Sequence, residues 1–64
     1  MSITYTGDGN AFAILGYCRR IISDAGGDTE AYFDEATSGD YNHLLGVSER
    51  WTEVDFSAYY QGSL

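Results

Sequence analysis

The chain has 64 residues, which is enough for one domain only, and a folded chain of this size buries only about 60% of the surface that its unfolded form exposes. Ten Asp and Glu residues against three Arg, with no Lys, give a formal net charge of −7. This balance argues against nucleic acid and anionic membranes as ligands, because both are bound through clustered Lys and Arg.

A strand and a helix are expected in the first part of the chain. Residues 2–6 alternate polar with β-branched or aromatic side chains, which predicts a half-buried strand. Residues 7–10 form a turn cluster whose last member, Asn10, is a good N-cap for a helix that begins at Ala11. Apolar side chains recur there at helical spacing and predict a buried face that ends before Gly26 and Gly27: Ala11, Ile14, Leu15, Cys18, Ile21, Ile22 and Ala25.

Two shorter helices are expected next. Asp28 is placed to cap a helix that reaches about Thr37, before a break at residues 38–39. Its inward residues are expected to be Tyr32, Phe33 and Ala36. Asp40 is placed to cap a third helix that reaches about Arg50. The inward residues of this helix are expected to be Tyr41, Leu44, Leu45, Ser48 and Trp51.

Residues 52–56 alternate again and predict a second strand, which we expect to pair antiparallel with the first so that neither strand is isolated. Residues 57–64 show no periodicity and are expected to form a tail that frays. The predicted fold is thus one compact α+β domain over residues 1–64, ordered strand, helix, helix, helix, strand, with the helices on one side. A purely helical bundle with frayed ends is the alternative.

The acidic residues cluster along the sequence. No Lys or Arg lies between Arg20 and Arg50. Within the expected second helix, Glu30 and Asp34 are i,i+4 neighbours, a like-charge pair that costs about 0.2–0.5 kcal/mol. Local conflicts of this kind tend to mark functional sites. The candidate partner-binding residues are Asp24, Asp28, Glu30, Asp34, Glu35 and Asp40, with Glu49, Glu53 and Asp55 as a second acidic edge.

Carboxylates along a helix can locally approach the charge density of duplex DNA, about one negative charge per 1.7 Å of axis. The pattern therefore predicts a surface that binds the Lys and Arg residues of a nucleic-acid-binding protein. The alternative is that acidity serves only solubility, although a surface made soluble by charge normally intersperses both signs.

Catalytic and metal sites are not expected. His43 has no second histidine or cysteine cluster to complete a metal site, so a surface or capping role is expected. Cys18 lies on the apolar stripe of the first helix and is expected to be a buried packing thiol, not a nucleophile. Paired carboxylates need a pocket that shifts their pKa values before they can act as acid and base. We therefore expect no enzyme, no cofactor and no metal.

The compartment follows from the same sequence. A single cysteine excludes an internal disulfide and fits a reducing environment. No apolar run approaches the roughly 20 residues that cross a bilayer, and the first residues lack the basic start of a secretion signal. We expect a soluble protein in the cytoplasm of a host bacterial cell.

Two motifs carry a resemblance. GDGNAFA at residues 7–13 and ATSGDYNHLL at residues 36–45 resemble those of small phage-encoded proteins of largely unassigned function. Among short acidic phage proteins, the anti-CRISPR inhibitors include several that resemble DNA in charge, and the chain is similar to type I inhibitors of this DNA-mimic kind. The resemblance implies a monomer that binds a subunit of a CRISPR surveillance complex and excludes DNA stoichiometrically. The alternative is a phage adaptor or structural module that binds through Tyr59, Tyr60 and nearby apolar surface.

Overall fold

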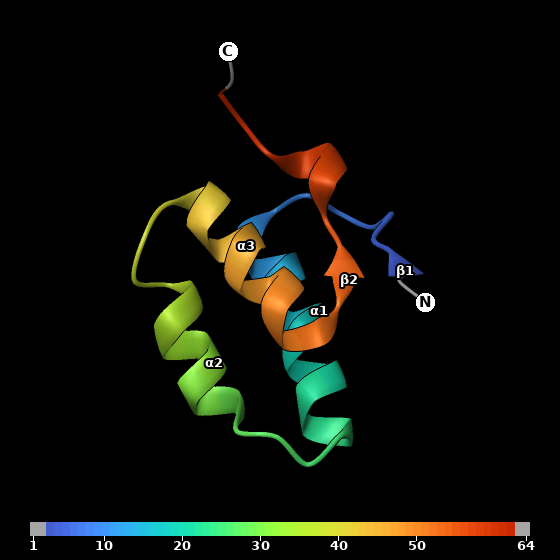
Figure 1. The fold of residues 1–64 in the computed structure, drawn as a ribbon, viewed down its shortest axis with the longest axis vertical. Coiled ribbons are helices and arrows are strands. Elements are labelled where there is room, and N and C mark those ends of the chain that lie inside the picture. Colours follow the sequence, from blue (N-terminus) through green and yellow to red (C-terminus); the bar gives the residue numbers. More distant parts are fainter. Residues whose placement is uncertain (1–2, 63–64) are drawn as a thin grey trace.

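Three helices separate two short strands in the computed structural model, which describes residues 3–62 (Figure 1). The elements are, in chain order, β1 (Ile3–Thr4), α1 (Ala11–Asp24), α2 (Thr29–Ala36), α3 (Tyr41–Thr52), β2 (Val54–Asp55) and a 3₁₀ turn, η1 (Ser57–Tyr59). This small α+β arrangement agrees with the predicted order of elements. Ser2, part of the predicted first strand, lies outside the described residues.

Side-chain oxygens cap the start of each helix, at the three residues that the sequence predicts. Asn10 Oδ1 accepts from the Phe12 amide at 2.8 Å. Asp28 Oδ1 accepts from two amides of α2 at 3.1 Å each, and Asp40 Oδ1 accepts from the His43 amide at 2.9 Å. Each cap satisfies helix N–H groups that have no intrahelical partner. The capping predictions are therefore confirmed.

The two strands pair in parallel, so the predicted antiparallel pairing is wrong. Ile3 lies opposite Val54, Thr4 lies opposite Asp55, and the amide of Tyr5 donates to Asp55 O at 2.9 Å. The reason is visible in Figure 1, where the chain alternates in direction through β1, α1, α2, α3 and β2. With three alternating helices between them, the first and the fifth segments run the same way.

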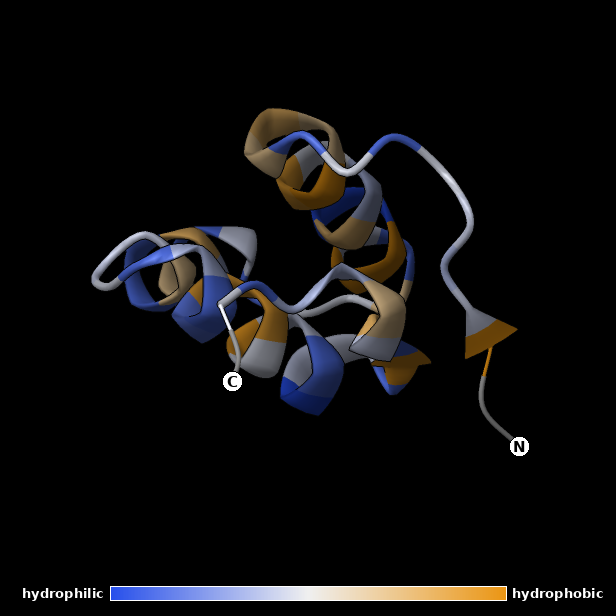
Figure 2. Ribbon diagram, turned by 90° about the horizontal axis from the view of Figure 1, so that it is seen from above, coloured by the Kyte–Doolittle hydropathy of each residue, from blue (hydrophilic) through white to orange (hydrophobic). Residues whose placement is uncertain are grey.

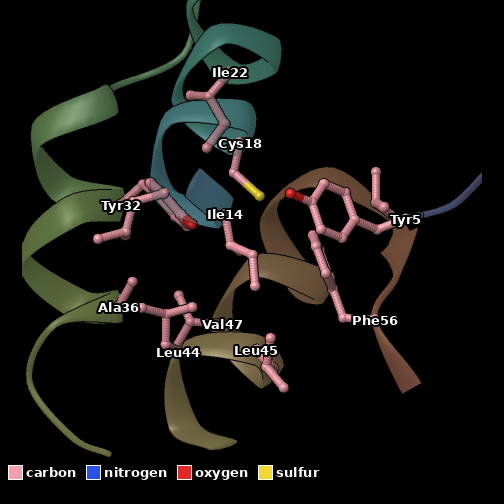
Figure 3. Packing of buried hydrophobic residues seen from close by; sticks show 12 residues of the cluster. Tyr5, Ile14, Cys18, Ile22, Tyr32, Ala36, Leu44, Leu45, Val47 and Phe56 are labelled. Carbon is pink, nitrogen blue, oxygen red and sulfur yellow. The ribbon is translucent and has the colours of Figure 1, made fainter. Parts of the chain in front are cut away.

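The core lies where the three helices meet β2 and the segment after β1 (Figure 3). Its buried hydrophobic members are Tyr5, Ile14, Leu15, Cys18, Ile22, Tyr32, Ala36, Leu44, Leu45, Val47, Val54 and Phe56. The predicted burial of Cys18 is confirmed. The predicted inward position of Phe33 is wrong, because Tyr32 and Ala36 occupy the buried side of α2 and Phe33 remains 36% exposed.

Tyr5 lies at the centre of an aromatic cluster that joins both ends of the chain. Its ring centroid is 4.8 Å from that of Tyr17, 5.0 Å from that of Phe56 and 5.4 Å from that of Tyr59. Tilted aromatic pairs at such distances each add about 0.5–1.5 kcal/mol beyond the area that they bury. The cluster therefore packs the segment after β1 against α1, against the residue that follows β2, and against η1.

Tyrosine hydroxyls also hold the loop between β1 and α1. Tyr59, Tyr5 and Tyr41 donate, in that order, to the consecutive carbonyls of residues 7–9. The three donors come from η1, from the N-terminal segment and from the first turn of α3. The loop that leads into α1 is thus fixed by residues that lie far apart in the sequence.

Tyr32 and Ser48 form a polar contact inside the core. Both residues are fully buried, and their hydroxyl oxygens lie 2.6 Å apart. Within residues 3–62, no buried side-chain nitrogen or oxygen lacks a hydrogen-bond partner. The contact therefore ties α2 to α3 without leaving an unsatisfied group.

We expect Tyr32→Phe and Ser48→Ala each to lower the free energy of unfolding by about 1–2 kcal/mol, because each leaves one buried hydroxyl without its partner. The double variant should lose less than the sum, since it removes both polar groups. Urea denaturation of the four proteins measures the coupling. Strictly additive losses would contradict this account.

Gly16 lies in the middle of α1, and a Cβ at this position would meet nothing within 4 Å. We expect Gly16→Ala to raise the free energy of unfolding by about 1 kcal/mol, the difference between the two residues in a helix interior. Thermal unfolding of the two proteins tests this expectation. A lower unfolding temperature for Gly16→Ala would show that the residue serves the fold.

Candidate interaction surface

The nine acidic residues predicted to bind a partner fall into two groups. The first group already accepts hydrogen bonds within the chain and consists of Asp28, Glu35, Asp40, Glu49 and Asp55. The second group accepts none from the described residues and consists of Asp24, Glu30, Asp34 and Glu53. All four members of the second group are exposed.

Glu35 joins α2 to α3. Its Oε2 forms an ion pair with Arg50 Nη2 at 2.5 Å, and its Oε1 accepts from the indole N–H of Trp51 at 3.1 Å. Both bonds lower the pKa of the Glu35 carboxyl from its ordinary value of 4.5, and the bond from Trp51 has the larger effect. The ion pair therefore brings Arg50, the first basic residue after the acidic stretch of the sequence, into contact with a member of that stretch.

The second acidic edge is brought together beside β2. Glu49, Glu53 and Asp55 line one open hollow with Val54. Two of these carboxylates also shape the chain. Glu49 Oε2 accepts from the amide of Phe56 at 2.9 Å, and Asp55 Oδ1 accepts from the backbone amide of the first η1 residue at 2.8 Å, which lowers the pKa of Asp55.

The tail tyrosines both have partners within the chain. Tyr60 donates to Glu49 Oε1 at 2.8 Å, and burial together with this carboxylate raises the pKa of Tyr60 to about 12. Tyr59 donates to the carbonyl of Gly7 at 2.8 Å. Gln61 exchanges two hydrogen bonds of 2.8 Å with the side chain of Asn42. Residues 57–61 of the tail are thus connected to α3 and to the loop before α1.

The exposed side of α2 carries both signs of charge. Glu30 and Asp34 line a hollow with Phe33 and with Arg19, which comes from α1. The Arg19 guanidinium carbon lies 5.5 Å from the centre of the Phe33 ring, within the range of a cation–π contact. The packing of α1 against α2 therefore places a positive group beside a pair that is purely acidic in the sequence.

The structure also contains an exposed apolar groove in which none of the predicted site residues lies. Residues 3–7 and α1 line it, and Ile3 and Phe12 are 61% and 81% exposed. The signal for it is present in the sequence, since Phe12 falls outside the apolar stripe of α1. A large apolar side chain is thereby directed towards solvent.

The His43 side chain contacts the segment that connects α2 to α3 and the end of α2. Its Nε2 lies 3.1 Å from Ser38 Oγ and 2.9 Å from Glu35 O. Among residues 3–62, no three His, Cys, Asp or Glu residues are grouped as a metal ion requires. Nor is any helix in that part of the chain long and apolar enough to span a membrane.

Comparisons with known proteins give no relative. No family model matches the chain, and neither a curated protein nor a solved structure matches it. The resemblance to anti-CRISPR inhibitors therefore stays a prediction.

The bonds to Glu35 predict a dependence of stability on pH. A lowered pKa in the folded state stabilises the protein above the unfolded value near 4.5, and this contribution is lost as pH falls through the folded value. We expect Glu35→Gln to be less stable than the wild type at pH 7 and equally stable at low pH. Thermal unfolding across this range measures the difference.

Asp34→Asn is the matched control, because it removes a neighbouring charge that accepts no hydrogen bond from the described residues. Its stability at pH 7 should equal or exceed that of the wild type, since it relieves the repulsion from Glu30. A loss as large as that of Glu35→Gln would contradict the assigned roles.

Proposed function

We propose that the chain is an inhibitor that binds the basic, nucleic-acid-binding surface of another protein and excludes duplex DNA from it. The observation that carries this proposal is the pair of Glu30 and Asp34. They lie four residues apart on α2, they are exposed, and neither accepts a hydrogen bond from the described residues. Their mutual repulsion costs stability, whereas their proximity concentrates negative charge for a cationic partner.

The contacts are assigned first to the carboxylates that the fold does not use. They are Glu30 and Asp34 on α2, Asp24 at the end of α1, and Glu53 in the edge beside β2. The other five predicted acids add to the field of a chain with a net charge of −7. Long-range attraction of this kind speeds association and weakens when salt is added.

The resemblance noted in the sequence suggests the target. A type I CRISPR surveillance complex holds DNA on basic protein surfaces, and the proposed action is stoichiometric occlusion of such a surface in the cytoplasm of a bacterial host. This mode of action requires neither a cofactor nor a catalytic group.

The alternative role as an adaptor through the tail gains little support from Tyr59 and Tyr60. The hydroxyls of both residues donate within the chain, to Gly7 and Glu49 respectively. Removing the tail would also remove a ring that packs on Tyr5. A tail deletion therefore tests folding together with binding, and point substitutions are the sharper experiment.

We expect the triple variant Asp24→Asn, Glu30→Gln, Asp34→Asn to lose competition with duplex DNA on a purified type I surveillance complex. Each lost charge contact should weaken binding several-fold, and the triple variant by about 100-fold, which corresponds to about 2.7 kcal/mol. Association rates measured at low and high salt should show a smaller salt dependence for the variant.

Single variants provide the control for charge alone. Glu30→Gln and Glu53→Gln change the net charge equally, but they lie on α2 and beside β2. A larger effect of Glu30→Gln assigns the contact to α2, and a larger effect of Glu53→Gln assigns it to the second edge. The proposal fails if the folded triple variant competes with DNA as well as the wild type does.

A further inference from the structure

A groove between the N-terminal segment and α1 combines exposed apolar groups with the positive charge of Arg20. It lies between residues 3–7 and the face of α1 that carries Phe12, Gly16 and Arg20. In Figures 1 and 2, β1 and α2 lie on opposite sides of the molecule. The β1 side of the groove therefore lies away from α2, whereas Arg20 also lines a neighbouring hollow that includes Thr29 of α2.

Large apolar side chains form its walls. Phe12 is 81% exposed and Ile3 is 61% exposed, the two highest values among the exposed large hydrophobic residues. Tyr5 and Tyr17 also line the groove, with ring centroids 4.8 Å apart. The fold gains little from leaving such groups in water, whereas a partner that covers them gains buried apolar area.

The charged side chains that line this region are arginines, and Asp24, four residues after Arg20 on α1, lies outside the lining. No Asp or Glu lines the groove or the adjoining hollow, which is formed by residues of α1 and the start of α2. Arg20 lines both, and Arg19 lines the hollow, so two of the three arginines of the chain lie here. Arg20 forms no ion pair with any residue from 3 to 62.

Gly16 leaves the surface of α1 between Phe12 and Arg20 open. Phe12, Gly16 and Arg20 follow each other at four-residue intervals and so lie along one face of α1. No atom of the described chain lies within 4 Å of a Cβ built at Gly16. Glycine is unfavourable in a helix interior, and no contact within the chain explains it here.

We propose that this groove binds a segment of a partner protein in which a large apolar side chain lies close to a carboxylate. The apolar side chain packs on Phe12 and Ile3, the segment crosses α1 at Gly16, and the carboxylate pairs with Arg20. A guanidinium binds a carboxylate through two parallel hydrogen bonds, which fixes the direction of the segment. The complementarity of charge selects an acidic segment although the chain as a whole is acidic.

A library of displayed short random peptides, selected on the immobilised full chain, tests this proposal. We expect enriched peptides to combine a large apolar residue with Asp or Glu. Their Kd should rise at least about tenfold for Arg20→Glu and for Phe12→Ser, since each removes one of the two contacts. Gly16→Gln should also weaken binding, because its side chain occupies the crossing point.

The unfolding temperatures of these variants control for folding, and Phe12→Ser should unfold like the wild type because Phe12 is already exposed. The variant Glu30→Gln, Asp34→Asn is the control for the other face and should bind acidic peptides unchanged. Enrichment of basic peptides alone, with binding that needs Glu30 and Asp34, would support the proposed inhibitor function and overturn this proposal. Binding that survives both Arg20→Glu and Phe12→Ser, enrichment of no sequence, or self-association of the chain through this groove would overturn it as well.

Discussion

The packing of Tyr5 is the interaction on which the rest of the molecule depends. Its ring contacts Tyr17 of α1, Phe56 after β2 and Tyr59 of η1, while its amide donates to Asp55 O of β2. Two strands of two residues each are too short to hold together alone. The aromatic cluster supplies the missing stability, fixes the loop that leads into α1, and so places the groove beside Phe12.

Carboxylates serve both stability and charge in this chain. The caps Asp28 and Asp40 start helices, Glu35 joins α2 to α3, and Glu49 holds the turn after β2. A chain of this size has few apolar contacts to spare, so hydrogen bonds to charged groups matter to its stability. The exposed acids without such bonds are the ones that carry the proposed function.

The two proposed surfaces are opposite in character. The face of α2 presents Glu30 and Asp34, and the groove at α1 presents Phe12 and Arg20. Arg19 lies between them, over Phe33, and limits the acidic face on the side of α1. The two proposals together describe a chain that binds a basic surface through α2 and an apolar, acidic segment through the groove at α1.

The sequence by itself determined the local features. Neighbouring residues determine where the helices begin, at Ala11, Thr29 and Tyr41, and which residues cap them. They also determine the burial of Cys18, because capping and periodicity act within a few positions. Tertiary structure alone decided the rest. The parallel pairing depends on how three helices alternate in direction, and the partners of Glu35 and Arg19 depend on which helices pack together. Those contacts join residues far apart in the chain, and no local pattern encodes them.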